Sequence, residues 1–223
     1  MEAARAAGRK SLIRTRWLSI LAAAAAIAIV ASGGRYLWAK YLRVRTPGLI
    51  VLAGDCTTTN LAPWLKKELM GRYDVWCTSD FVDSRSLKTN LEDWILSKKP
   101  DVVIFSVGLT DTFHTKGIIN VPLGEYEDNL RCVVKTLREK SRARLLWMPT
   151  VPAVRKQKNA ELDTYNAAAD RVMKEAGIEV YDRNSALKAA GIERLVSDDK
   201  IHPNSGAYCL MTKDLCRLLR RLN

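Results

Sequence analysis

Hydrophobic and polar positions alternate between two spacings along most of the chain after Pro47. Short runs rich in Val, Ile and Leu are separated by longer segments in which apolar residues recur every three or four positions. The short runs predict strands that are covered on both faces, and the longer segments predict amphipathic helices. The predicted strands are residues 48–55, 73–78, 101–108, 143–149 and 178–183, and the predicted helices are residues 60–70, 86–99, 124–141, 159–177 and 205–222. This alternation predicts an α/β domain with a parallel sheet of about five strands and helices on both faces.

The first 46 residues follow neither spacing. No charged residue occurs from Trp17 to Gly34, a run of 18 residues, and crossing the hydrocarbon core of a bilayer takes about 20. Tyr36, Trp38 and Tyr41 are suited to the far interface of the membrane. We therefore expect two parts: a basic N-terminus with a transmembrane anchor at about residues 17–38 within residues 1–46, and a folded domain at residues 47–223.

A cleaved signal peptide is the alternative, because small residues follow the apolar run in "VASGG". The apolar stretch continues past that point through Leu37 and Trp38, which favours an uncleaved anchor. Five Lys or Arg residues precede the run and four follow it closely, so the charge bias specifies orientation only weakly. We expect a single-pass protein whose domain lies on the extracytoplasmic side.

The net charge of +12 suggests nucleic-acid binding until the charges are located. Nine of the 36 basic residues but only one of the 24 acidic residues lie in residues 1–46, which leaves 27 basic and 23 acidic residues in the domain. The excess therefore belongs to the membrane segment, and we do not expect a nucleic-acid partner. Cys209 and Cys216 are seven positions apart on one predicted helix, about 10.5 Å along its axis, too far for a disulfide. No spacing indicates a metal site, and we expect no cofactor.

Three segments should meet at one edge of the sheet, because functional residues of parallel sheets gather beyond the carboxyl ends of the strands. They are "GDC" at 54–56, "VGLTDTFH" at 107–114 and "DDKIHPNSGAY" at 198–208. The sequence has only two histidines, His114 and His202, and both lie in these segments.

With "GLTD" at 108–111 and "DKIHPNSGAY" at 199–208, "GDC" resembles the spaced blocks of the SGNH (GDSL-type) hydrolases. The resemblance covers essentially residues 48–222, and Asp-x-x-His-Pro is its most specific part. It implies a three-layer, flavodoxin-like fold, with the strands in the order 2-1-3-4-5, and the hydrolysis or transfer of acyl groups. The implied substrate is an acyl ester, including an acylated glycan or lipid.

The family's site residues carry over unevenly. Cys56 stands where the family has its nucleophilic serine, whereas Asp199 and His202 match the orienting acid and the base without change. Thr110 replaces an asparagine that donates to the oxyanion. The glycine of the second block is missing from residues 80–83, so that the backbone N–H of Phe81 or Asp80 would have to serve. Asp55 and Gly108 complete the residues that the resemblance places around the oxyanion and the substrate.

Two hypotheses of different classes follow. The first is a membrane-anchored acyl-ester hydrolase or acyltransferase with a Cys56–His202–Asp199 triad, in which a helix N-terminus and the histidine lower the pKa of the thiol. The second is a catalytically inactive binding or scaffolding module of the same fold, with a structural cysteine. Among the neighbouring residues, we expect helix capping by Thr57, Thr58 and Thr59, a solvated Asp198 and a surface His114.

Overall fold

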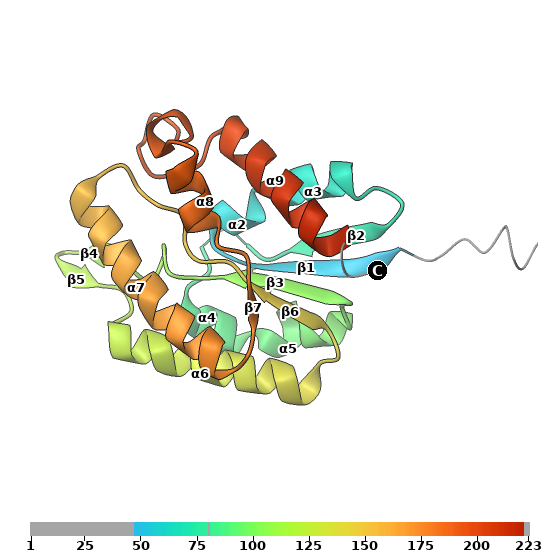
Figure 1. Cartoon of the computed structure of the whole chain (residues 1–223). Helices are drawn as coiled ribbons and strands as arrows, with labels where there is room; N and C mark the ends of the chain where they lie inside the picture. The colour runs from blue at the N-terminus through green and yellow to red at the C-terminus, as the bar shows by residue number, and fades with distance from the viewer. Residues whose placement is uncertain (1–46, 80, 221–223) are drawn as a thin grey trace, which may run out of the picture. The chain divides into compact units, whose positions relative to one another are not determined.

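The computed structural model describes residues 47–79 and 81–220 as a sheet between two layers of helices (Figure 1). The sheet contains five parallel strands in the order β2-β1-β3-β6-β7, which confirms the predicted order. Its strands are β1 (Gly48–Gly54), β2 (Tyr73–Cys77), β3 (Val102–Ser106), β6 (Arg144–Trp147) and β7 (Glu179–Val180). The helices are α2 (Cys56–Thr59), α3 (Ala62–Glu68), α4 (Ser84–Thr89), α5 (Leu91–Trp94), α6 (Leu123–Lys140), α7 (Lys156–Glu175), α8 (Arg183–Ala189) and α9 (Ser205–Arg220).

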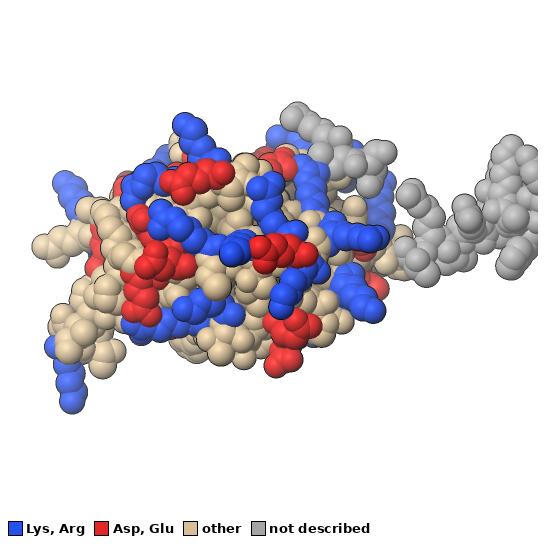
Figure 2. Space-filling model, turned by 90° about the horizontal axis from the view of Figure 1, so that it is seen from below, with Lys and Arg blue, Asp and Glu red and all other residues tan. Residues whose placement is uncertain are grey.

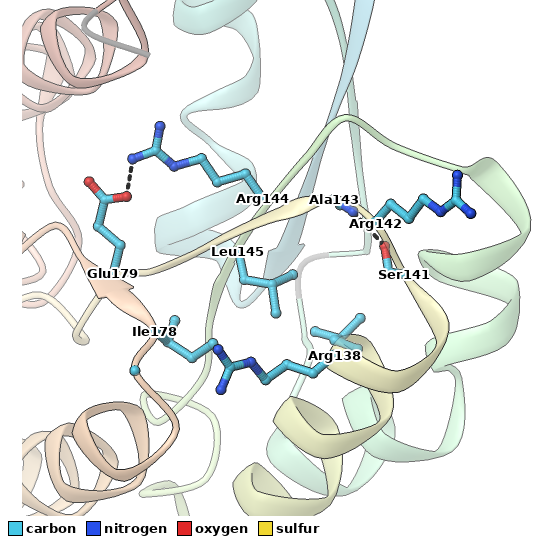
Figure 3. Close-up of a pocket in the computed structure, with 10 residues that line it drawn as sticks. Arg138, Ser141, Arg142, Ala143, Arg144, Leu145, Ile178 and Glu179 are labelled. Atoms are coloured by element: carbon cyan, nitrogen blue, oxygen red, sulfur yellow. Dashed lines mark hydrogen bonds and ion pairs between the residues drawn. The ribbon is translucent and has the colours of Figure 1, made fainter.

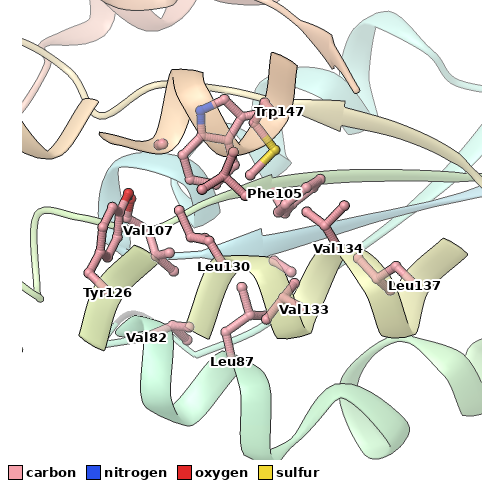
Figure 4. Packing of buried hydrophobic residues seen from close by; sticks show 14 of the residues in the cluster. Val82, Leu87, Phe105, Val107, Tyr126, Leu130, Val133, Val134, Leu137 and Trp147 are labelled. Atoms are coloured by element: carbon pink, nitrogen blue, oxygen red, sulfur yellow. The ribbon is translucent and has the colours of Figure 1, made fainter. Parts of the chain in front are cut away.

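Both faces of the sheet are covered because successive side chains of a strand point to opposite faces. In β1, Val51 and Ala53 pack in the cluster formed with α4, α5, α6 and α7. Ile50 and Leu52 pack in the opposite cluster, with α3, α8 and α9. In Figure 4 the side chains of α6 point towards the sheet, where Phe105 meets Trp147 edge-on with ring centroids 5.2 Å apart. The central strands are therefore apolar along their whole length, as the sequence pattern requires.

Several predicted boundaries are wrong for local reasons. The helix expected at 86–99 consists of α4, α5 and a 3-10 turn (Leu96–Lys98), because the side-chain amide of Asn90 donates to the Ser86 carbonyl (2.8 Å) at the break. The last strand ends early, since Asp182 accepts a hydrogen bond from Ser185 N–H and begins α8, a helix that the pattern did not predict.

A small hairpin was also missed. It pairs β4 (His114–Thr115) with β5 (Ile118–Ile119) in antiparallel fashion. Its two turn residues, Lys116 and Gly117, have φ angles of 52° and 80°, which is the backbone of a type I′ hairpin turn.

The transmembrane anchor expected at about residues 17–38 lies outside the described residues. Among residues 47–79 and 81–220, no helix has the length and apolar character needed to cross a membrane.

A buried carboxyl group ties two loops together at the carboxyl edge of the sheet. Asp111 is fully buried, and its Oδ1 accepts a hydrogen bond from Ser84 N–H (2.9 Å) at the start of α4. The Ser84 hydroxyl in turn accepts from the side-chain amide of Asn129 on α6 (3.0 Å). Burial raises the pKa of Asp111 to about 7, and the charges of Asp83 and Asp55 add to the rise. Hydrogen bonds with Ser84 lower the pKa of Asp111, but they offset only part of this rise.

We expect Asp111 to make the domain less stable as the pH rises. The group is protonated in the folded state up to about pH 7 but ionises near pH 4 in the unfolded chain, so its contribution to stability is present below pH 4 and is lost as the pH approaches 7. Between about pH 5 and about pH 8 this loss amounts to about 3 kcal/mol of the free energy of unfolding.

Asp111→Asn, which cannot ionise, should therefore show a smaller fall than wild type when both are unfolded with urea at these two pH values. Titration of all other groups is common to both proteins. An equal fall in the two would mean that Asp111 ionises normally in the folded state.

Candidate active site

The candidate nucleophile lies where β1 ends and a single helical turn begins. Gly54 is required there, because a Cβ at this position would be 2.0 Å from the carbonyl oxygen of Ser106 on β3. Asp55 caps the turn by accepting from Thr57 N–H (3.1 Å) and from the Thr57 hydroxyl (2.6 Å). Cys56 is therefore the first residue of α2, with its side chain half-buried at the carboxyl edge of the sheet.

The candidate base lies in a tight loop before α9. Asp199 Oδ1 accepts hydrogen bonds from the backbone N–H groups of Ile201 and His202, both at 2.9 Å. A short bridge between Val196 and Pro203 closes the loop, and His202 O accepts from Ser197 N–H (2.7 Å). The loop therefore holds the acid and the base in one local unit, as the three-residue offset in the sequence predicts.

The three candidate catalytic side chains form one continuous line. Cys56 Sγ lies 3.1 Å from His202 Nε2, and His202 Nδ1 lies 2.5 Å from Asp199 Oδ2. When Nδ1 donates its proton to Asp199, Nε2 is left to accept the proton of the thiol. The arrangement can therefore generate a thiolate and an imidazolium side by side.

Asp199 is suited to orienting the histidine. Partial desolvation raises the pKa of its carboxyl group, but hydrogen bonds from Ile201 N–H and from the imidazole and N–H of His202 outweigh this and lower the pKa to about 2. Asp199 is thus ionised at neutral pH. Asp198, next to it, is exposed.

The expected oxyanion residues lie on two loops that are linked by a residue the sequence analysis missed. The side-chain amide of Asn120 donates to Asp83 Oδ2 (3.0 Å) and to the Thr110 carbonyl (3.1 Å). This link holds the loop that carries Phe81 near Thr110, which is 9% exposed. Thr110 makes no side-chain hydrogen bond within the described residues, and the Phe81 side chain is 76% exposed. Asn120 had no sequence signal, because it directly follows the hairpin that the pattern did not predict.

Gly108 and Asp55 lie just beyond the ends of β3 and β1, respectively. Gly108 has a φ of 140°, and a Cβ there would lie 2.6 Å from the Thr150 hydroxyl, so no other residue fits without strain. Asp55 is fully buried. Burial raises the pKa of its carboxyl group, and the charge of Arg183 and the hydrogen bonds from Thr57 offset only part of that rise.

One expectation about α2 is wrong. Thr57, Thr58 and Thr59 are not capping residues, because Asp55 is the cap and the three threonines are buried inside the turn. The helix also has only four residues before the chain bends into α3, so its dipole is small. The hydroxyl groups of Thr57 and Thr58 instead contact the guanidinium of Arg183 (3.1 and 3.2 Å), a second residue that the sequence analysis missed.

An apolar cluster lies against the thiol. Leu109, Ala153 and Leu162 are buried at its centre, and Cys56, Phe113 and Ile201 pack on it. His114 is exposed nearby, as expected, with its Nε2 3.4 Å from Glu161. The nucleophile therefore faces an apolar surface that is rimmed by charged groups.

A separate cavity lies at the opposite edge of the sheet. It has a volume of about 360 Å³ and is lined by the end of α6 and the starts of β6 and β7 (Figure 3). Arg138 donates to the Ala176 carbonyl and Arg144 pairs with Glu179, so these two guanidinium groups are already engaged.

In a view of the domain from below, basic and acidic side chains are interspersed (Figure 2). On the helical layer formed by α6 and α7, Glu127 pairs with both Arg131 and Arg171.

Comparison with solved structures shows the same fold in esterases. The acetyl xylan esterase AlAXEase is 17% identical with a TM-score of 0.67, and the match covers 76% of this chain and 98% of that one. Axe2, an acetylxylan esterase from Geobacillus stearothermophilus, is 17% identical with a TM-score of 0.62 over 78% of this chain and 95% of that one. A lipase/acylhydrolase from Enterococcus faecalis is 14% identical with a TM-score of 0.66 over 78% and 95%. At these identities the likeness shows the fold alone.

The sequence itself matches a family model. No curated protein matches the chain, but residues 46–209 match the GDSL-like Lipase/Acylhydrolase family. This span includes the β1 edge, Thr110 and the loop of Asp199 and His202. The expected resemblance is thereby confirmed: the chain belongs to the GDSL-like lipase/acylhydrolase family, a family of hydrolases.

Proposed function

We propose that this protein is an acyl-ester hydrolase in which Cys56 is the nucleophile, His202 the general base and Asp199 the orienting acid. The observation that carries the proposal is the pair of contacts at His202, 3.1 Å to Cys56 Sγ and 2.5 Å to Asp199 Oδ2. A nucleophile within hydrogen-bond reach of a base, which is itself oriented by a third group, is the requirement for covalent catalysis.

The reaction would proceed in two steps. His202 Nε2 takes the thiol proton as Cys56 Sγ forms a bond to the ester carbonyl carbon, and the carbonyl oxygen becomes an oxyanion. The C–O bond to the alcohol then breaks, and His202 returns the proton to the leaving alkoxide. Water next attacks the thioester with His202 as base, releases the carboxylic acid and restores the thiol. An alcohol in place of this water would give acyl transfer instead of hydrolysis.

The partly buried side of the apolar cluster is suited to the acyl group. Phe113 and Ile201 pack on this cluster together with Cys56, and all three are only partly buried. A surface of this kind favours the hydrocarbon part of an ester over a charged group. Two of the similar structures are acetyl xylan esterases, which makes acylated glycans, besides acylated lipids, a substrate class to include in a screen.

The inactive-module hypothesis rests on two changes from the family pattern: Cys56 replaces the nucleophilic serine, and the oxyanion positions are altered, with Thr110 in place of an asparagine. Removing one oxyanion donor typically costs about 3 kcal/mol of transition-state stabilisation, or roughly a hundredfold or more in rate. Thr110 retains a hydroxyl donor, and an altered donor weakens catalysis without removing the triad. We therefore favour a slow enzyme over an inactive binding module.

Cys56→Ala should reduce turnover at least about a thousandfold, because the nucleophile is lost. Cys56→Ser, which keeps a nucleophile beside His202, should retain or raise the hydrolysis of oxygen esters. The measurement is hydrolysis of short- and long-chain acyl esters and thioesters by the full-length chain.

Alkylation with iodoacetamide gives an independent readout. Cys56 should react faster than Cys132, which is exposed on α6, and His202→Ala should slow the reaction of Cys56 alone. Equal turnover by wild type and Cys56→Ala, together with alkylation of Cys56 no faster than that of Cys132, would favour the binding module.

Thr110→Asn should raise kcat about tenfold or more, because the longer amide side chain can reach the oxyanion. Thr110→Val, which has nearly the same shape without the hydroxyl, should lower kcat while leaving KM little changed. Steady-state kinetics on the best ester of the screen measures both. If neither substitution changes kcat, Thr110 does not face the oxyanion.

We also propose that residues 17–38 anchor the protein in a membrane with the domain on the extracytoplasmic side. The uncharged run from Trp17 to Gly34 and its aromatic flank support this. The full-length chain should stay in the membrane fraction after a carbonate wash, whereas residues 47–223 should be released. Protease added to intact cells should digest the domain. Retention of residues 47–223 after the wash would contradict a sole N-terminal anchor.

A further inference from the structure

Arg183 is a buried cation that contacts the helical turn beginning at Cys56. It is the first residue of α8, directly after the Asp182 cap, and its side chain turns into the protein and is 0% exposed. Burying a guanidinium is costly unless hydrogen bonds replace its water. A fully buried arginine at the carboxyl edge of the sheet therefore requires a reason.

The guanidinium is solvated by uncharged oxygen atoms. Its Nη2 donates to hydroxyl groups of both α2 and β3, and its other nitrogens donate to carbonyl groups. The contacts are Thr57 Oγ1 at 3.1 Å, Thr58 Oγ1 at 3.2 Å, Ser106 Oγ at 2.8 Å, the Thr57 carbonyl at 3.1 Å and the Pro149 carbonyl at 2.7 Å. Among the described residues, none of these five partners carries a charge. The positive charge is thus held in place without being neutralised by a direct ion pair.

This fixed charge acts on the residues at the start of α2. Burial lowers the pKa of Arg183, and negative charge on Asp55 opposes that shift most, with smaller opposing contributions from Tyr208, Tyr181 and Cys56. The interaction is reciprocal: whatever a Cys56 thiolate contributes to keeping Arg183 charged, Arg183 contributes to keeping Cys56 ionised. Because the interior has a low effective dielectric, such a charge acts more strongly than one at the surface.

We propose that Arg183 is a positioning residue of the active site, which braces the turn that carries Cys56 and supplies the fixed positive charge that stabilises its thiolate. The proposal rests on Cys56 being the nucleophile. Such a charge is needed because the dipole of α2 gives only a weak positive potential at Cys56. The helix has only four residues, and its cap is the carboxyl group of Asp55. Through its hydrogen bonds to Thr57 and Thr58, Arg183 restrains the two residues that directly follow Cys56.

The test is the pH midpoint of Cys56 alkylation in the full-length chain, followed by mass spectrometry of the peptide that contains Cys56. Arg183→Gln should raise the midpoint by about one pH unit, because the positive charge is lost. Arg183→Lys keeps a positive charge without the planar fork and should lie closer to wild type than Arg183→Gln. Arg144→Gln, which removes a charge at the opposite edge of the sheet, is the matched control and should leave the midpoint unchanged. Equal midpoints in wild type and Arg183→Gln, or in the Lys and Gln variants, would overturn the proposal.

A second variant leaves the buried network intact in case substitutions of Arg183 prevent folding. His202→Gln removes the imidazole from a loop at the surface, and the midpoint of Cys56 should still lie below about 8.5, the value for an unperturbed cysteine. A midpoint at or above about 8.5 would overturn the role of Arg183. Failure of the proposed function looks different, since Cys56→Ala would then match wild type in turnover whatever the midpoints are.

Discussion

The pairing of β1 with β3 is the constraint on which the rest of the structure depends. The two strands approach so closely at their carboxyl ends that a side chain at Gly54 would collide with the backbone of Ser106. A strand pair this tight places the residues that follow each strand side by side. Cys56 and Thr110, 54 positions apart in the sequence, are thereby brought to the same edge. The candidate site follows from this contact before any catalytic side chain is considered.

The third part of the site comes from a loop that is shaped by its own hydrogen bonds. Asp199 accepts the N–H groups of Ile201 and His202 with one oxygen and meets the imidazole with the other. The acid therefore performs two tasks, since it shapes the loop and orients the base. Packing of α9 on α3 and the sheet places His202 beside Cys56, although the two residues are 146 positions apart in the sequence.

Three ionisable side chains are buried in the interior around the nucleophile. Asp55, Asp111 and Arg183 are all fully buried, and each is held by hydrogen bonds rather than by a direct ion pair with another of the three. Burial raises the pKa of both carboxyl groups and lowers that of the guanidinium. A fold selected only for stability would gain by replacing such groups with apolar residues. Their presence beside Cys56 is consistent with an interior arranged to control the charge of the thiol.

The sequence by itself determined the strands and helices of the sheet, because these depend on local patterns, and its resemblance to a family indicated the strand order and the three catalytic candidates. Apolar runs such as that of β1 specify strands through burial on both faces, and Asp199 and His202 are close enough in sequence to be recognised as one unit. It also indicated which family the chain belongs to, through motifs of a few adjacent residues.

Only the tertiary structure decided what surrounds these candidates. Asn120 and Arg183 act through contacts with residues 10 to 126 positions away, and no periodicity or short motif encodes such a contact. The roles of Thr57 and Thr58 changed for the same reason. Near a helix start they suggest caps, but their hydroxyl groups contact Arg183 of α8, which is more than 120 positions away in the sequence. The periodicity of apolar side chains predicts which face of a helix or strand is buried. It does not predict which charged side chain from another element packs against that face, because those elements meet only when the chain has folded.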